Sequence, residues 1–151
     1  MAGPLDKVIH PFDQKRIIDA IASAERLTSG EIAVHVEGRC AAPEPKDRAA
    51  ELFQKLGVTR TQDRNGVLIY VAVRDRRFAL MGDSAIDEPP ASPFWQDANK
   101  RLTIALRRGA VGDGICGAIA AVGQQLCKRF PRSAEHKNQL ENELTTDPAA
   151  L

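Results

Sequence analysis

The stretch RNGVLIYVAVRDRRFALMGD, residues 64–83, decides the fold of this 151-residue chain. Val67 to Val73 is an uncharged run rich in β-branched residues, which is typical of a strand covered by other elements on both faces. The charged residues after it predict a turn, and Phe78 to Met81 then returns as an antiparallel strand. This hairpin brings the Gly-Asp pair at its end beside the Asn-Gly pair at its start, so two polar motifs meet at one edge of the sheet.

The flanking sequence predicts one further strand and several helices. Apolar and polar residues alternate over Glu31 to Glu37, which indicates a strand. Helical stripes are predicted over residues 11–27, 47–56, 93–109 and 113–130. Because a strand, a helix and a second strand form a right-handed parallel unit as a rule, the 31–37 and 67–73 strands are expected to lie parallel. We therefore predict an α/β fold, a three-layer α/β/α sandwich with a small mixed central sheet flanked by about four helices.

Length and composition indicate one domain without an extreme charge. We expect a single domain over residues 1–131, followed by a polar, flexible C-terminal tail over residues 132–151. The formal net charge is +1, which argues against a nucleic-acid partner. No signal peptide and no stretch of roughly twenty apolar residues is present, so we expect no membrane span and a cytoplasmic location.

Residues 112–117, GDGICG, match the G-x-G-x-x-G fingerprint of dinucleotide-binding folds. That fingerprint follows a strand, whereas a helix is predicted before these glycines. We interpret the motif as a tight turn between two helices, with Asp113 as a helix cap and small residues for close packing. The three histidines have no zinc-like spacing, and we expect His35 to be a packed, hydrogen-bonded residue of the first strand.

Carboxylates gather at the edge where the parallel strands start and the antiparallel strand ends. Segments 29–31, 61–66 and 82–87 converge there. Their oxygen-rich side chains suit a hard divalent cation, calcium before magnesium. The candidate metal ligands are Glu31, Asp63, Asp83 and Asp87, and the supporting residues are Arg64, Asn65, Gly66 and Gly82. Two alternatives stay open: these are ordinary solvated loop charges or turn caps, or Arg64 neutralises the carboxylates.

The opposite edge of the sheet is a second candidate site. The segment Gly38-Arg39-Cys40, Asp75 and the start of the last helix at Asp113 are expected to gather there, where open α/β sheets usually bind ligands. Cys40 has no neighbouring histidine in the sequence that would generate a thiolate. We therefore interpret Cys40 as an exposed thiol without a catalytic role.

These motifs resemble those of the TPM domain family, which is named for a thylakoid lumen protein, a photosystem II repair protein and a nematode acetylcholine-receptor modulator. The resemblance covers roughly Phe12 to Pro131 and points to a small soluble bacterial branch. The matching motifs, in chain order, are TSGEI at 28–32, TQDRNGVLI at 61–69, DRRFA at 75–79, GD at 82–83 and FW at 94–95.

The resemblance implies a three-layer α/β/α sandwich. It also implies calcium binding in an acidic groove, acid phosphatase activity as in a plant relative, or an accessory role for membrane complexes. Many relatives carry a signal peptide and a C-terminal membrane helix, and we expect neither here. The branch shows Gly-Asp-x-Gly-Ile where this chain has Ala85 in place of the second glycine, so a positive φ at that position would strain the loop.

Three functions follow from these observations. The first is a non-catalytic or weakly catalytic domain that binds a divalent cation and acts through contacts with a protein partner. The second is a metal-assisted phosphomonoesterase, in which the cation polarises the phosphoryl group and activates water while Arg64 stabilises developing charge. The third is an interaction module without a metal. The sequence identifies neither a catalytic residue nor the partner protein.

Overall fold

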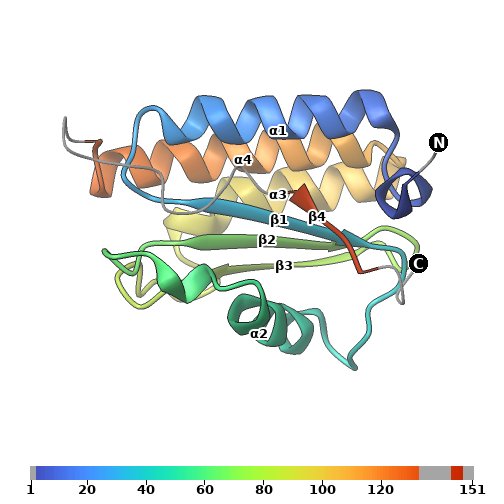
Figure 1. The fold of residues 1–151 in the computed structure, drawn as a ribbon, viewed down its shortest axis with the longest axis horizontal. Coiled ribbons are helices and arrows are strands. Elements are labelled where there is room, and N and C mark those ends of the chain that lie inside the picture. The colour runs from blue at the N-terminus through green and yellow to red at the C-terminus, as the bar shows by residue number, and fades with distance from the viewer. Residues whose placement is uncertain (1–2, 133–143, 148–151) are drawn as a thin grey trace.

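The structure is a computed structural model that describes residues 3–132 and 144–147 (Figure 1). Its elements, in chain order, are the 3-10 helix η1 (Pro4–Lys7), α1 (Pro11–Glu25), β1 (Ile32–Glu37), α2 (Pro45–Lys55), the 3-10 helix η2 (Val58–Arg60), β2 (Val67–Ala72), β3 (Arg77–Gly82), α3 (Pro93–Arg108), α4 (Val111–Arg129) and β4 (Leu144–Thr145).

The helices form two layers around one sheet (Figure 1). α1, α3 and α4 cover one face, and α2 packs on the other face against β2 and β3. The strand order is β3-β2-β1-β4. β2 pairs antiparallel with β3 and parallel with β1, and β1 pairs parallel with β4. The predicted α/β/α sandwich with a mixed sheet is confirmed, with four α-helices in the described part of the chain.

β2 is one of the two interior strands of the sheet, and its side chains alternate between two cores. Odd-numbered side chains pack in the core under α1, α3 and α4, and even-numbered side chains pack in the core under α2. All six side chains, from Val67 to Ala72, have no exposed surface. Burial of a large apolar side chain contributes about 1.5–3 kcal/mol, so an uncharged run is required here. The prediction of a strand covered on both faces is confirmed.

α3 and α4 are joined by a very short turn. Gly109 ends α3 with a φ of 73°, a left-handed conformation that favours glycine. α4 begins two residues later at Val111, and its capping position is Ala110. The predicted helix cap at Asp113 is therefore wrong, because Asp113 lies inside the first turn of α4. Its negative charge still favours the helix there, since the helix dipole is positive at the N-terminus.

The glycines at the start of α4 allow close packing of helices. A Cβ atom on Gly114 would lie 2.5 Å from Cβ of Ala105 on α3. A Cβ atom on Gly112 would lie 2.4 Å from Cγ of Asp13 on α1. Both distances are shorter than any normal carbon contact. The glycine motif thus serves helix packing, as predicted, and it follows a helix instead of a strand.

The C-terminal segment, predicted to be a flexible tail, contains a strand. Residues 144–147 are described, and the first two of them form β4 on the outer side of β1. Leu144 lies opposite Val34, and Thr145 lies opposite His35. The remainder of the predicted tail, apart from Arg132, lies outside the described residues.

Candidate functional site

A cleft of about 590 Å³ lies at the edge of the sheet where β3 ends, beside the first turn of α3. Its lining includes three acidic residues, Asp83, Asp87 and Glu88, together with Trp95. Asp83 and Asp87 belong to the predicted ligand set. Glu88 follows in the same loop, one residue beyond the segment that the sequence analysis considered. Three acidic residues therefore line one cavity.

Arg64 and Asp83 form a two-pronged ion pair at this cleft. The Asp83 N–H donates to the carbonyl of Gly66 at 2.9 Å, which joins the end of the hairpin to its start. Arg64 Nε and Nη2 then lie 2.7 and 2.9 Å from the two carboxylate oxygens of Asp83, and the Ser84 N–H donates to the same carboxylate at 2.7 Å. The hydrogen bonds to Asp83 raise the pKa of Arg64. Arg64 thus neutralises Asp83, which is the alternative that the sequence left open.

Arg129 on α4 holds the loop that follows β3. Its guanidinium donates to the carbonyls of Ile86 at 2.7 Å and Ala85 at 3.2 Å, and it pairs with Glu88 at 3.1 Å. The left-handed residue of this loop is Asp87, with a φ of 43°, and Ala85 has no positive φ. The backbone strain anticipated at Ala85 is therefore absent, because the loop makes its left-handed turn two residues later.

Two of the other predicted ligands do not line the cleft. Asp87 is exposed and lines it, whereas Asp63 is exposed elsewhere and Glu31 is fully buried beside Glu25. Within residues 3–132 and 144–147, no group of three or more His, Cys, Asp or Glu side chains is arranged to hold a metal ion. The cleft offers the oxygen donors that a hard cation needs, but Arg64 occupies both oxygens of Asp83. A cation at Asp83 therefore competes with Arg64.

The predicted supporting residues shape this edge. A Cβ atom on Gly66 would lie 2.7 Å from Cγ1 of Val58, and one on Gly82 would lie 2.8 Å from its nearest side-chain neighbour. Asn65 is buried, and its Nδ2 donates to Oγ of Ser29 at 3.2 Å. These residues bring the two loops of the edge together by close approach and by hydrogen bonding.

Two buried carboxyl groups lie together at the junction of α1 and β1. Glu25 is 1% exposed and Glu31 is 0% exposed. Oε2 of Glu25 accepts a hydrogen bond from the Ile32 N–H at 2.8 Å. Burial, reinforced by the neighbouring Glu31, raises the pKa of Glu25 to about 9, against the lowering effects of the Ile32 N–H and of Arg132. Glu25 therefore holds a proton at neutral pH.

The residues of the second candidate edge fall into two separate clusters. Oδ2 of Asp75 accepts the Cys40 N–H at 2.7 Å, and Oδ1 pairs with Nη1 of Arg39 at 3.2 Å. Asp113 pairs with Arg16 of α1 at 2.9 Å. Asp75 thus holds the loop after β1, and Asp113 joins two helices.

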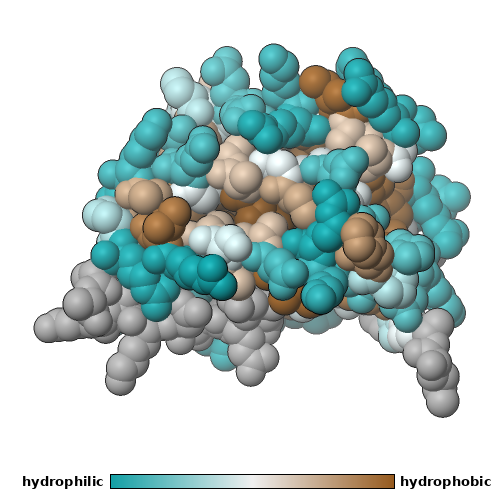
Figure 2. Space-filling view, turned by 90° about the horizontal axis from the view of Figure 1, so that it is seen from above, coloured by the Kyte–Doolittle hydropathy of each residue, from teal (hydrophilic) through white to brown (hydrophobic). Residues whose placement is uncertain are grey.

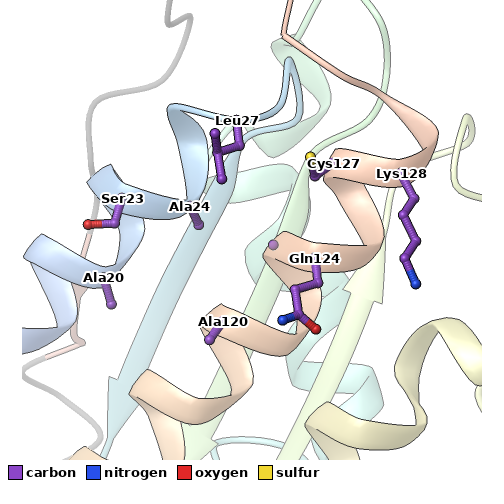
Figure 3. A pocket seen from close by; sticks show the side chains of 9 residues that line it. Ala20, Ser23, Ala24, Leu27, Ala120, Gln124, Cys127 and Lys128 are labelled. Carbon is purple, nitrogen blue, oxygen red and sulfur yellow. The ribbon is translucent and has the colours of Figure 1, made fainter.

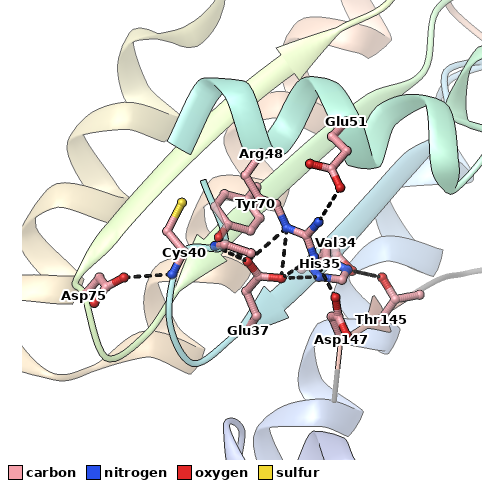
Figure 4. A network of polar contacts seen from close by, with 11 residues as sticks. Val34, His35, Glu37, Cys40, Arg48, Glu51, Tyr70, Asp75, Thr145 and Asp147 are labelled. Atoms are coloured by element: carbon pink, nitrogen blue, oxygen red, sulfur yellow. Dashed lines mark hydrogen bonds and ion pairs between the residues drawn. The ribbon is translucent and has the colours of Figure 1, made fainter. Parts of the chain in front are cut away.

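A buried polar network that was not predicted from the sequence lies between β1, β2 and α2 (Figure 4). Its centre is Glu37, which is 0% exposed. Glu37 pairs with Nη2 of Arg48 at 2.9 Å, contacts Nε2 of His35 at 3.0 Å and accepts from the Tyr70 hydroxyl. Burial alone would raise the pKa of Glu37, but the hydrogen bonds from His35, Arg48 and Tyr70 lower it to about 2. Glu37 is therefore ionised, and the prediction of a packed, hydrogen-bonded His35 is confirmed.

An apolar groove of about 800 Å³ runs between α1 and α4 on the outer face (Figure 3). Small residues line it, among them Ala20, Ala24 and Gly123, and Leu27 at one end is 64% exposed. Figure 2 looks onto this layer of helices and shows apolar side chains in the middle of the face between hydrophilic rims. The groove offers apolar contact area and no carboxylate cluster.

The fold and the acidic cleft together define a class of protein. It is a small α/β/α sandwich in which an Asn-Gly motif before β2 meets a Gly-Asp motif at the end of β3. In the described part of the chain, no helix is long and apolar enough to cross a membrane.

The chain belongs to the TPM domain family, whose profile matches residues 5–125. The NMR structure of the BA42 protein from the psychrophilic bacterium Bizionia argentinensis has a TM-score of 0.84 and 34% sequence identity, covering 92% of this chain and 95% of BA42. Two N-terminal domains are more distant and share the fold. The N-terminal domain of a protein from P. gingivalis has a TM-score of 0.66, and that of cg2496 from Corynebacterium glutamicum has a TM-score of 0.59. Each shares 18% sequence identity with this chain, and each match covers 87% of this chain and 83% of the matched chain. No functionally curated protein matches the chain.

Proposed function

We propose that this protein is a TPM-domain binding module that takes up a divalent cation in the cleft of Asp83, Asp87 and Glu88 and acts through contact with another protein. The observation that carries the proposal is that three acidic residues line one cleft. Calcium is favoured over magnesium because it accepts irregular shells of about six to eight oxygens, including backbone carbonyls, whereas magnesium demands a near-ideal octahedron.

Two arginines act as internal counter-ions of this cleft. Arg64 covers Asp83, and Arg129 covers Glu88 and two loop carbonyls. A divalent cation therefore competes with guanidinium groups for the same oxygens. Arg64 is the easier one to displace, because its side chain is 50% exposed while that of Arg129 is 35% exposed. The Arg64 side of its pair is half exposed but the Asp83 side chain is only 5% exposed, so this pair is stronger than a fully exposed one and the competition lowers the affinity for the cation.

The test is a calcium titration, followed by a magnesium titration, of metal-stripped full-length protein with backbone amide shifts as the readout. We expect saturable shifts in the loop after β3 and around Arg64. Arg64→Gln removes the competing charge and should raise calcium affinity about fivefold. Asp83→Asn should lower the affinity, and Asp97→Asn, which removes an exposed carboxylate on α3, serves as the matched control. If neither the natural chain nor Arg64→Gln binds calcium up to millimolar concentration, the proposal is wrong.

A metal-assisted phosphomonoesterase is the second candidate, and the half-exposed guanidinium at the cleft mouth favours it. A bound cation would supply Lewis-acid chemistry to a phosphoryl group, and Arg64, once released from Asp83, could bind a phosphoryl oxygen. Hydrolysis of a chromogenic phosphate distinguishes the two candidates. An enzyme should lose its rate in Asp83→Asn, whereas a binding module should titrate calcium and show no turnover above the blank.

Protein contact is the other part of the proposal, and the groove between α1 and α4 supports it. Its apolar lining and the exposed Leu27 give contact area of the kind found at protein interfaces. In a pull-down with the tagged chain, Leu27→Glu should release a partner that binds there, while Asp83→Asn should not. A partner retained by Leu27→Glu would place the protein contact on another face.

A further inference from the structure

β1 would be an edge strand of the sheet if the chain's own C-terminal segment did not cover it. The strand order ends β1-β4, and β4 contributes two residues, Leu144 and Thr145. They pair in parallel with Val34 and His35. Figure 1 shows β4 beside β1. An edge strand presents free backbone donors and acceptors, and an added extended segment satisfies them. The outer side of β1 therefore accepts a strand.

Three side chains of the C-terminal segment make distinct contacts with the body of the protein. Leu144 packs against the apolar core under α1 and α4. Oγ1 of Thr145 lies 2.9 Å from Nδ1 of His35. Oδ2 of Asp147 lies 2.8 Å from Nη2 of Arg48, whose side chain is only 3% exposed. The spacing defines a pattern: an apolar residue, a threonine, any residue and an aspartate.

The groups that contact this pattern are held in place by residues outside the C-terminal segment (Figure 4). The second ring nitrogen of His35 is fixed by Glu37 at 3.0 Å. Nε and Nη2 of Arg48 are bound to the same carboxylate at 3.1 and 2.9 Å, and Nη1 is bound to Glu51 at 2.9 Å. The Tyr70 hydroxyl donates to Glu37 from β2. A binding surface fixed in advance saves the entropy of ordering its side chains when a ligand arrives.

We propose that the outer edge of β1, from Val34 to the Arg48 guanidinium, is a peptide-binding site, which residues 144–147 fill in cis. Its ligand in trans is an extended segment of a partner protein with the same pattern, apolar–Thr–x–Asp, added as a parallel strand. Backbone pairing with β1 gives affinity, and His35 and Arg48 select the threonine and the aspartate. The partner's segment binds by displacing residues 144–147 of the chain itself, so this cis segment sets the partner concentration that binding requires.

The partner concentration that binding requires depends on the tethering of the cis segment. Residues 144–147 belong to the same chain as β1, so a free peptide competes with a local concentration on the order of millimolar. Loss of the Asp147 contact weakens the cis segment and should open the site. Asp97→Asn removes an exposed carboxylate on α3, which contributes nothing to the strand site, so this variant is the matched control.

The experiment titrates a synthetic peptide, NELTTDPAA, into ¹⁵N-labelled full-length protein and follows the Val34 and His35 amides and the Arg48 Nε signal. Full-length Asp147→Ala should bind this peptide with a Kd at least tenfold lower than that of the natural chain or of Asp97→Asn. The peptide NELTTAPAA should bind Asp147→Ala at least tenfold more weakly than NELTTDPAA. Leu144→Asp is a second variant that releases the cis segment, for use where Asp147→Ala disturbs folding.

Two results would overturn the proposal. One is the absence of saturable shifts in both released variants up to millimolar peptide, with the dispersed amide spectrum of a folded protein. The other is equal binding of the two peptides, since the Arg48 contact would then select nothing. Saturable shifts confined to β1 and Arg48, dependent on the aspartate, would support it.

Discussion

Replacing Glu25 by glutamine should remove a pH-dependent loss of stability from this protein. The folded state raises the pKa of Glu25 from its ordinary 4.5 to about 9, through burial and the neighbouring Glu31. Between these values the folded protein holds a proton that the unfolded chain releases. The stabilising contribution is therefore complete below pH 4.5, and it falls as pH rises until the folded carboxyl also ionises near pH 9.

The pKa of Glu25 also sets an upper limit on this change in the free energy of unfolding. Each pH unit inside this window costs at most about 1.36 kcal/mol, so pH 5 to 7.5 corresponds to an upper limit of about 3.4 kcal/mol. The Ile32 N–H and Arg132 both favour the ionised form of Glu25, so we expect about 1–2 kcal/mol in practice. Glutamine has the shape of the protonated acid and can donate an N–H to Glu31. Glu25→Gln should therefore match the natural chain near pH 5 and exceed it by about 1–2 kcal/mol at pH 7.5.

The assay is urea denaturation followed by circular dichroism at half-unit pH steps from 5 to 8. The informative quantity is the difference in unfolding free energy between Glu25→Gln and the natural chain. Asp19→Asn, which removes an exposed carboxylate of the same helix, is the control and should keep the natural pH slope. A difference that does not change with pH, or a natural chain whose advantage over the variant grows with pH, would refute the reasoning.

Two further predictions concern packing and the buried network. Gly114→Ala should lower the free energy of unfolding by about 1–3 kcal/mol, because its Cβ would lie 2.5 Å from that of Ala105. Gly117→Ala, whose nearest neighbour is a flexible arginine side chain at 3.1 Å, should be close to neutral; equal thermal shifts in both variants would contradict this account. Tyr70→Phe removes a hydrogen bond to buried Glu37 and should cost about 1–3 kcal/mol. That hydrogen bond also helps to hold the pKa of Glu37 near 2, so the pKa of Glu37 in the folded Tyr70→Phe variant should be higher. In an acid titration, the variant should therefore lose the stability contributed by ionised Glu37 at a higher pH than the natural chain does. An unchanged pH midpoint of acid unfolding would contradict this role of the network.

The sequence predicted those parts of the fold that depend on local patterns. The uncharged run of β2 and the charged turn after it lie within one hairpin, so periodicity and turn chemistry were sufficient. The helix ends at Gly57 and Gly109 were also predictable from the local sequence, because both glycines have the left-handed backbone conformation that ends helices. The start of α4 was misplaced because Asp113 is a good capping residue, while the close contact of α3 and α4 fixes the turn two residues earlier.

The buried network depends on contacts that a local pattern does not show. His35 and Glu37 lie two residues apart on one face of β1, and Arg48 is on a helix eleven residues further along. One signal was present. Arg48 falls on the same helical face as Leu52, four positions later, so a charge stands on the buried stripe of α2. A charged residue on an apolar helix face beside a strand with a carboxylate is evidence for a buried ion pair.

The C-terminal strand was unpredictable for a different reason. β4 has only two residues, and its place is set by contacts with residues about a hundred positions away. The polar residues of this segment led to the prediction of a flexible tail, because threonine and aspartate are ordinary surface residues. In the folded chain they contact His35, which was expected to be packed and hydrogen-bonded, and Arg48, whose burial was not expected. The strand site depends on the buried network, so neither could be predicted without the other.

The pH dependence of calcium affinity distinguishes the carboxylates of the cleft from the buried pair Glu25 and Glu31, because different charges balance the two groups. Asp83 and Glu88 are balanced by arginines, whose charge is constant between pH 5 and 8, so calcium affinity in the cleft should be nearly flat over that range. Glu25 is balanced by a proton. A cation bound by Glu25 and Glu31 must displace that proton, and its affinity should rise by up to about tenfold per pH unit. Because Arg64→Gln raises affinity only at the cleft, the pH profile and this variant together assign the site.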